Sequence, residues 1–426
     1  MSANRFLIAM VDAGGTVPPT IGLAAELLRR GHRVHVLADP TVATAAISAG
    51  CSFTPWQEAP HVTTREEQTA LIAAFEGRNP YRAIKAVRGF AGHGMTGRYA
   101  SDVISTAREF GVDAILGDAI LPGIVIGALA TELPTAALMA NVYLPPTVGY
   151  PLFGTGWQPG ASMIAKARDW LAPTAVQWLL GRTVPRLNAV LRSNGGPPIL
   201  RFSDLLDRCS RVLIMTSPSF DFAVPRLPEN VRYVGPILDD PHWAAEVAWR
   251  RTGREPLVLV ATSSVYQNQV DLLQRVARAL GQLPVRGLLT TGRAVDPKKI
   301  DAPPNAEVLP AAPHRQVLAE ASAVVTHAGH GSVLKALAAG VPLVCMPMGR
   351  DQRDNTVRVL QLGAGVQISK SSPPGRIAVA ISEILENPRY ASAARRFADV
   401  LAREATTLPS GADEAEGLSS GPRTRR

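Results

Sequence analysis

The sequence predicts an α/β protein made of two doubly wound domains with parallel sheets. At 426 residues the chain exceeds the size at which one hydrophobic core stops growing, so two domains are expected. Hydrophobic residues make up 46% of the chain and gather in short continuous runs separated by amphipathic helical stretches. Such runs are typical of parallel strands that helices cover on both faces, because neither side of the strand then meets water.

The first half of the chain begins with the pattern of a doubly wound sheet. A buried run at 5–11 is followed by a glycine- and proline-rich loop at 12–18, a helix that begins at Pro19, and a second strand at 33–37. In such sheets the functional loops lie at the carboxyl ends of the strands. Further strands are predicted at 51–54, 112–117, 135–140 and 211–215, and helices at 40–49, 64–110, 122–131 and 162–192.

The second half repeats this organisation after a change of composition. Residues 217–255 are rich in proline, aspartate and arginine and are interpreted as an interdomain linker. The tail at 405–426 is polar and is expected to be mobile. The predicted parts are therefore 1–216, 217–255, 256–404 and 405–426. Strands are predicted at 256–261, 285–290, 306–309, 322–326, 341–346 and 365–368, with helices from Gln267, from Gly331 and at 373–404.

Charge and composition exclude several classes of protein. The net charge is +9, but the basic residues are scattered and aromatic residues make up only 5%, so no nucleic-acid motif is indicated. A generally basic surface or contact with an anionic membrane or ligand would both explain the charge. The three cysteines are far apart, and the apolar stretch at 114–142 is interrupted, which favours a cytoplasmic protein without a transmembrane helix and with possible peripheral membrane contact.

The run at 313–355 has the pattern of an anion site. A buried strand at 322–326 ends at His327, and a helix follows from Gly331, with Ser332 near its first turn. Free backbone N–H groups at such a helix start favour phosphate, and Gly329 allows close approach. Lys335 is expected in the first turn, where a bound diphosphate would compensate its charge. The alternative is an ordinary strand–helix turn in which His327 is a hydrogen-bonded core histidine.

This ordered run resembles the nucleotide-sugar signature of the family 1 (UDP-glycosyltransferase-like) glycosyltransferases, of the bacterial natural-product or lipid type. The resemblance implies a GT-B fold, in which two Rossmann-like domains face a central cleft, with acceptor binding in 1–216 and donor binding in 256–404. It also implies that His327 contacts the donor diphosphate, that Gly331 and Ser332 hold it, and that Asp351 and Gln352 bind sugar hydroxyls.

The predicted donor site also includes residues outside this core motif. Ser263 and Ser264 end a strand, where phosphate contact and helix capping are both open. Two departures from the family leave the nucleotide open between UDP and dTDP: Lys335 replaces the glutamate that usually holds the ribose, and Ala311 replaces the tryptophan that stacks on uracil in plant members. The full donor-binding set is Ser263, Ser264, Ala312, His327, Gly329, His330, Gly331, Ser332, Asp351 and Gln352.

The catalytic base is a third departure from the family. Thr16 stands where the resemblance implies a histidine, and a threonine hydroxyl cannot accept the acceptor's proton at its ordinary pKa. Asp12 at the end of the first strand is therefore predicted as the base, with Asp118 as its orienting partner. The alternatives are that Asp12 bonds its own loop and that Asp118 caps a helix. Thr16 and Pro18 are predicted to contact the acceptor.

The predicted function is inverting, metal-independent transfer of a sugar from a nucleoside diphosphate to a hydroxyl of a small hydrophobic natural product or lipid. No Asp-x-Asp pair occurs in the sequence, so neither a metal nor any other cofactor is expected. The partners are then the nucleotide-sugar donor and the acceptor, with the protein a monomer or homodimer. A non-catalytic relative acting as an activator is the alternative, and a dinucleotide oxidoreductase is disfavoured because Leu334 breaks the glycine fingerprint.

Overall fold

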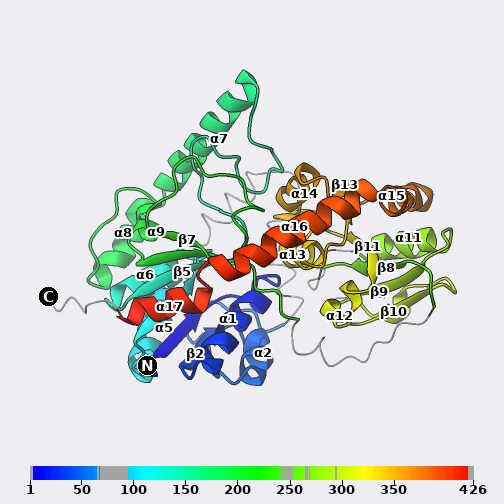
Figure 1. The fold of residues 1–426 in the computed structure, drawn as a ribbon. Helices are drawn as coiled ribbons and strands as arrows, with labels where there is room; N and C mark the ends of the chain where they lie inside the picture. Colours follow the sequence, from blue (N-terminus) through cyan, green and yellow to red (C-terminus); the bar gives the residue numbers. More distant parts are fainter. Residues whose placement is uncertain are drawn as a thin grey trace.

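The protein consists of two lobes, each built on an all-parallel sheet covered by helices (Figure 1). A computed structural model describes residues 3–64, 67, 95–240, 244, 253–263, 267, 269–292 and 295–420. The two sheets have seven and six strands, and helices lie on both faces of each, which confirms the predicted α/β class with two Rossmann-like domains.

The first sheet has the strand order β3-β2-β1-β4-β5-β6-β7. Register follows from the apolar runs, because Phe6 to Ala9 pair with Ala114 to Gly117 and all of these residues are buried. The strands are β1 (Arg5–Ala9), β2 (Arg33–Ala38), β3 (Ser52–Pro55), β4 (Ala114–Asp118), β5 (Thr135–Met139), β6 (Arg211–Ile214) and β7 (Val231–Tyr233). The helices of this lobe are α1 (Val17–Arg29), α2 (Ala43–Ser48), α5 (Met95–Phe110), α6 (Pro122–Ala130), α7 (Met163–Gly181), α8 (Val184–Ser193) and α9 (Asp204–Asp207), with the 3-10 turn η1 (Pro40–Val42).

The second sheet has the order β10-β9-β8-β11-β12-β13. Its central pair, β8 and β11, brings Ala261 opposite Thr326 at the carboxyl ends of the two strands. The strands are β8 (Leu257–Ala261), β9 (Arg286–Thr290), β10 (Ala306–Leu309), β11 (Ala321–Thr326), β12 (Leu343–Cys345) and β13 (Gly365–Gln367). The helices are α11 (Val270–Leu280), α12 (His314–Leu318), α13 (His330–Ala338), α14 (Gln352–Gln361), α15 (Pro374–Glu386) and α16 (Pro388–Thr407), with the 3-10 turn η2 (Pro297–Lys299).

Each sheet has one point at which the strand order reverses, and ligands of open α/β sheets bind there. In the first sheet the chain continues from β1 to β2 on one side, and β4 lies on the other. In the second sheet β8 and β11 are the corresponding neighbours. Asp12 and Asp118 lie at the first reversal, and Ser263 and His327 at the second, so the topology brings the predicted site residues of each lobe to one sheet edge.

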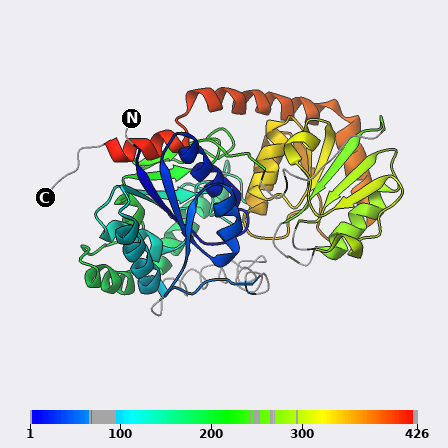
Figure 2. The same cartoon turned by 90° about the horizontal axis from the view of Figure 1, so that it is seen from below.

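The C-terminal helices cross back from the second lobe to the first. Figure 2 shows α16 running along one side of both lobes, and α17 (Gly411–Ser420) then packs on the first. The buried residues Ala412, Ala415 and Leu418 join the core that contains Leu23. The prediction of a mobile polar tail is therefore wrong for residues 405–420, because small apolar residues at helical spacing give α17 a buried face; residues 421–426 lie outside the described ones.

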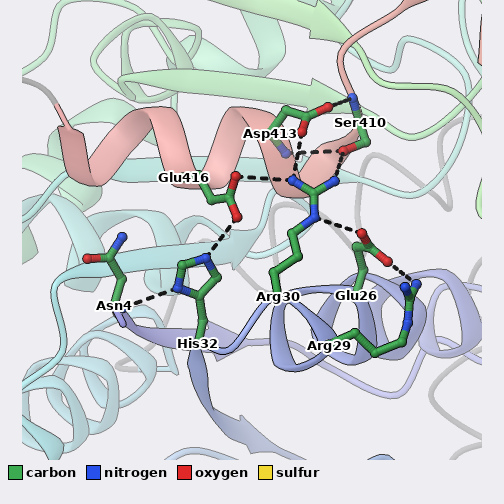
Figure 3. A network of polar contacts seen from close by, with 8 residues as sticks. All are labelled: Asn4, Glu26, Arg29, Arg30, His32, Ser410, Asp413 and Glu416. Atoms are coloured by element: carbon green, nitrogen blue, oxygen red, sulfur yellow. Dashed lines mark hydrogen bonds and ion pairs between the residues drawn. The ribbon is translucent and has the colours of Figure 1, made fainter. Parts of the chain in front are cut away.

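A polar network holds α17 to α1 and β2 (Figure 3). Nη1 of Arg30 lies 2.7 Å from Asp413 Oδ1 and 3.1 Å from Glu416 Oε2, and its Nε donates to Glu26. His32 joins α17 to the residue before β1. Its Nδ1 accepts the N–H of Asn4, and its Nε2 lies 2.8 Å from Oε1 of Glu416 on α17. These contacts hold α17 against α1 and the start of β1.

The structure differs from the predicted elements in three further places. The segment interpreted as a linker contributes β7 to the first sheet, so the lobe extends past residue 216. The predicted helix at 373–404 is two helices, because Pro388 begins a new one. The predicted helix at 162–192 is likewise divided into α7 and α8 by a turn before Pro185. Among the described residues no helix is long and apolar enough to span a membrane.

Candidate active site

A cavity of about 1170 Å³ lies between the two lobes and contains most of the predicted site residues. Its first-lobe side is lined by the loop after β1 and by apolar residues such as Leu121, Leu152 and Phe153. Its second-lobe side is lined by the segments after β8, β10 and β11 and by the start of α14. The structure therefore brings together polar groups suited to a diphosphate and an apolar wall suited to a hydrophobic molecule.

His327 lies at the carboxyl end of β11 and is buried. Burial lowers the pKa of this imidazole to about 4, so the ring is neutral near pH 7. Its Nδ1 lies 3.4 Å from both the hydroxyl of Thr326 and the carbonyl oxygen of Ala261, while that hydroxyl also accepts the N–H of Ala328. In the tautomer with its proton on Nε2, Nδ1 accepts from the Thr326 hydroxyl and Nε2–H can donate to an oxyanion; in the other tautomer, Nδ1–H donates to the Ala261 carbonyl.

The turn after His327 brings backbone close to that imidazole. Ala328 has φ of 67°, a left-handed conformation that is strained for a residue other than glycine. A Cβ on Gly329 would lie 2.5 Å from Nε2 of His327, so only glycine fits there. Gly329 is the N-cap of α13, and Gly331 and Ser332 lie in the first turn with no side-chain cap bond. Gly329, Gly331 and Ser332 line the cavity, and the first N–H groups of an α-helix have no partner within the helix, so this turn suits an anion.

His330 begins α13 and lines the same cavity. Its Nδ1 lies 3.1 Å from Oδ1 of Asn355. The Nδ2 of this asparagine donates to Ala328 and Asp351, so Oδ1 is the acceptor and Nδ1 of His330 carries the proton. Its Nε2 is buried without a hydrogen-bond partner among the described residues. Burial lowers the pKa of this imidazole as well. His330 is thus a neutral side chain with one unused polar atom beside the predicted sugar position.

The predicted sugar-binding pair begins α14, where Asp351 is the N-cap and Gln352 the first helical residue. Oδ2 of Asp351 accepts from Asn355 Nδ2 at 2.8 Å, and the rest of the carboxylate stays available. Gln352 is buried, and its amide oxygen accepts the N–H groups of Met348 and Gly349 at 2.7 and 3.0 Å. Both residues line the cavity, but the internal bonds of Gln352 show that it also fixes the loop.

The remaining donor residues follow two other strands. Ser263 comes after β8, is buried and lines the cavity, and its carbonyl oxygen accepts from Gln269. Ala312 lies between β10 and α12 and is also buried against the cavity. Ser264 lies outside the described residues. The donor-binding roles of all these residues stay predictions.

Lys335 has a different environment from the one the sequence predicts. It lies in the last turn of α13, where the helix dipole favours a cation, and not in the first turn. Its Nζ is 2.6 Å from Oδ1 of Asp240, whose other oxygen accepts the N–H of Arg315. The negative partner of Lys335 is therefore Asp240, and its charge does not by itself require a bound diphosphate.

The predicted catalytic carboxylates lie at the ends of adjacent strands. Asp12 accepts from the N–H of Gly14 at 3.0 Å and from the hydroxyl of Thr41 at 2.7 Å, so both of its oxygens have bonds within the first lobe. Asp118 is buried and accepts the N–H of Ile120 at 2.9 Å, and burial raises its pKa to about 6. Asp12 lines the cavity, whereas Asp118 lies behind that lining.

The predicted acceptor residues start α1. Thr16 is its N-cap and Pro18 lies in its first turn, and both line the cavity. The hydroxyl of Thr16 is buried without a hydrogen-bond partner in the part of the chain that the structure describes. Their contact with an acceptor stays a prediction.

The sequence did not predict the polar contacts that join the lobes. Arg358 of α14 lies 2.6 Å from Asp221 of the first lobe, with side chains 4% and 0% exposed. Asp354 on the same helix accepts the N–H groups of Gly154 and Gly156 at 2.5 and 2.7 Å. One helix thus connects the predicted sugar-binding residues to the loop that forms part of the apolar wall.

Comparisons with known proteins agree with this geometry. The family model described as UDP-glucoronosyl and UDP-glucosyl transferase matches residues 195–402. The 4'-demethylrebeccamycin synthase of Lentzea aerocolonigenes is 27% identical over 97% of this chain and 99% of its own. A solved kitacinnamycin glycotransferase superposes with a TM-score of 0.74, 24% identity and 98% of both chains covered. A spinosyn rhamnosyltransferase complexed with thymidine diphosphate has a TM-score of 0.65 and 19% identity over 98% of this chain and 100% of its own.

Two Rossmann-like lobes around one cleft define the GT-B fold, which the superpositions confirm. The chain is a glycosyltransferase of this fold, related to the UDP-glycosyltransferases. The sequence-based identification is therefore confirmed at the level of the fold and the enzyme class.

Proposed function

We propose that this enzyme transfers a sugar from a nucleoside diphosphate, UDP or dTDP, to a hydroxyl of a small hydrophobic natural product or lipid, with inversion and without a metal. One observation carries the proposal: a single cavity joins the start of α13 and His327 to an apolar first-lobe wall. A diphosphate at the first and an apolar acceptor at the second would leave the two substrates facing each other.

The leaving group supports the choice of the α13 site. When the bond between the sugar and the diphosphate breaks, negative charge grows on the bridging oxygen. Neutral His327, in its Nε2–H tautomer, and the first backbone N–H groups of α13 are donors that can stabilise this charge without a cation. Among the described residues no three His, Cys, Asp or Glu side chains gather to hold a metal ion.

The acceptor class is proposed from the cavity wall and from the relatives. Leu121, Leu152, Phe153 and Val176 line the first-lobe side, and such a wall favours an apolar acceptor because burial releases water from both surfaces. The printed names of similar proteins refer to rebeccamycin, kitacinnamycin and spinosyn, which suggests natural products as the first acceptors to examine.

The test is a two-step screen. UDP- and dTDP-sugars are first ranked by the rise in melting temperature that each causes, since a ligand that binds only the folded state stabilises it. The stabilising donors are then incubated with hydrophobic phenols and alcohols, and glycosides are detected by mass spectrometry before and after chelation. Glycoside formation that survives chelation is expected. A loss of activity that magnesium or manganese restores would contradict metal independence, and the absence of any glycoside would contradict the proposed function.

A further inference from the structure

The acceptor side of the cavity needs a group that takes a proton, and the position at which the family resemblance implies a histidine is occupied by Thr16. The carboxylates nearest to that position already have bonds within the protein. Asp12 accepts from Gly14 and from the hydroxyl of Thr41. Asp39, which follows β2 as Asp12 follows β1, accepts the N–H of Asp12 at 2.6 Å. These bonds hold the loop together and occupy oxygens of both carboxylates.

The same Asp39 carboxylate brings a second segment to this loop. Its other oxygen accepts the N–H of Val62 at 2.8 Å, so the backbone at residue 62 and the backbone at residue 12 are held by one buried side chain. The residue before Val62 is His61, which lines the cavity together with Asp12 and Thr16. A histidine therefore lines the same cavity as the position at which the family has one, but it comes from the segment after β3.

The segment that carries His61 is fixed at several points. The carboxylate of Asp102, on α5, accepts three consecutive backbone N–H groups at 2.9 to 3.1 Å. The hydroxyl of Tyr99, on the same helix, donates to the carbonyl oxygen of Pro60. Asp39 holds the following N–H, at Val62. These bonds fix the backbone on both sides of His61, and a fixed backbone holds a functional side chain in one place. The three N–H groups on Asp102 belong to Gln57, Glu58 and Ala59.

The hydrogen bond of the imidazole determines which nitrogen can act. Nδ1 of His61 lies 3.0 Å from the carbonyl oxygen of Ala59. A carbonyl only accepts, so Nδ1 carries the proton and the lone pair of the neutral ring is on Nε2. Nε2 accepts no hydrogen bond from the described part of the chain. This pattern, a donor nitrogen fixed by backbone and an accepting nitrogen left free in a cavity, is the one that a histidine base requires.

We propose that His61 is the general base of this enzyme, and the inference rests on the glycosyl transfer proposed above. Nε2 takes the proton of the acceptor hydroxyl while its oxygen forms the bond to the anomeric carbon. The bond from that carbon to the diphosphate oxygen breaks, and its electron pair leaves with the nucleoside diphosphate. The proton remains on the imidazolium until it is released to water. In this scheme Asp12 is not the base, and its bonds to Gly14 and Thr41 serve to hold the loop.

Two carboxylates lie close enough to stabilise that imidazolium. The pKa of Glu67 is lowered, first by the N–H and O–H bonds from Thr63 and also by the nearby charge of His61. Burial raises the pKa of Asp39, and the charge of His61 acts in the opposite direction. Protonation of His61 thus places a positive charge near these two carboxylates, which favours the state that forms during the reaction.

The test compares His61→Asn with Glu58→Gln, a matched control on an exposed side chain of the same loop. Donors that stabilise the wild type are used with two acceptors, 4-methoxyphenol and the far more acidic 4-nitrophenol. His61→Asn is expected to lower kcat with 4-methoxyphenol by a factor of about 10² to 10⁴. The loss is expected to be much smaller with 4-nitrophenol, which needs less help to lose its proton. Affinity for dTDP and UDP, measured by calorimetry, is expected to be unchanged, as is the activity of Glu58→Gln.

Several outcomes would overturn the proposal. Wild-type turnover with both phenols in His61→Asn, or an equal loss with both of them, would exclude proton removal by His61. A loss confined to Asp12→Asn would assign the base to Asp12. If His61→Asn does not fold, His61→Gln and restoration of His61→Ala by added imidazole provide the same comparison. An inactive wild type with every donor and acceptor would contradict the proposed function itself and the base with it, which separates the two failures.

Discussion

Replacing Arg358 with methionine is expected to destabilise the protein by about 3 kcal/mol, because it leaves a buried carboxylate without its cation. Arg358 lies 2.6 Å from Asp221, and both side chains are almost fully buried. Breaking a buried ion pair from one side costs about 3–5 kcal/mol. The lower value is expected here because Asp221 keeps four other donors, which are the N–H groups of Tyr143 and Phe222 and the hydroxyls of Tyr150 and Tyr233.

The assay is urea unfolding at neutral pH, followed by both tryptophan fluorescence and circular dichroism so that separate unfolding of the lobes is detected. Arg376→Met on an exposed position of α15 is the matched control and is expected to change the unfolding free energy by less than about 0.5 kcal/mol. The double variant Arg358→Met with Asp221→Asn is expected to cost less than the sum of the single changes by at least about 1 kcal/mol. A cost for Arg358→Met equal to that of Arg376→Met would refute the role of this pair in joining the lobes.

Three further predictions follow from individual contacts. His327→Ala removes one donor to the diphosphate and is expected to weaken dTDP or UDP binding by about 1–3 kcal/mol in calorimetry, and unchanged affinity would make the residue structural. Asp118 has its pKa raised to about 6, so it contributes stability below about pH 4 that is lost as pH rises through about 6. Between pH 4 and 7 the wild type should therefore lose up to about 3 kcal/mol relative to Asp118→Asn, and parallel curves would exclude this ionisation. A chain ending at Leu408 lacks α17. Its free energy of unfolding is expected to be lower by at least about 3 kcal/mol than that of a chain ending at Ser420, because Leu418 and two alanines lose their burial. Equal free energies of unfolding would mean that α17 does not stabilise the first lobe.

The strands and the donor motif were predictable because their signals are local. The runs 6–9 and 257–261 are apolar at every position and are typical of central strands. His327, Gly329 and Ser332 lie within one strand–helix turn, so their proximity follows from the sequence alone. The position of Lys335 was misjudged because α13 begins at His330 and already ends at Ala338, so that its last turn includes Lys335.

The rest of the site depends on contacts between distant segments. Asp39 could have been recognised, because it follows β2 as Asp12 follows β1, but His61 comes after an irregular turn that carries no periodic pattern. Its position relative to Asp12 depends on Asp39, whose carboxylate accepts N–H groups from both segments. Likewise, α17 was missed because alanines at helical spacing in a polar tail give a weak signal, whereas the packing of Ala412 and Ala415 on the first lobe is clear in three dimensions.

If the sugar is transferred with inversion in the cleft between the lobes, the anomeric configuration of the product is opposite to that of the donor. An α-linked dTDP- or UDP-sugar is incubated with the enzyme and a hydroxyl acceptor. The coupling constant between the anomeric proton of the glycoside and the proton on the neighbouring carbon is then measured by NMR. A β-glycoside is expected, formed at a rate that falls sharply in His61→Asn. An α-glycoside would contradict direct attack by a deprotonated hydroxyl, and release of nucleoside diphosphate without any glycoside would contradict the transfer itself.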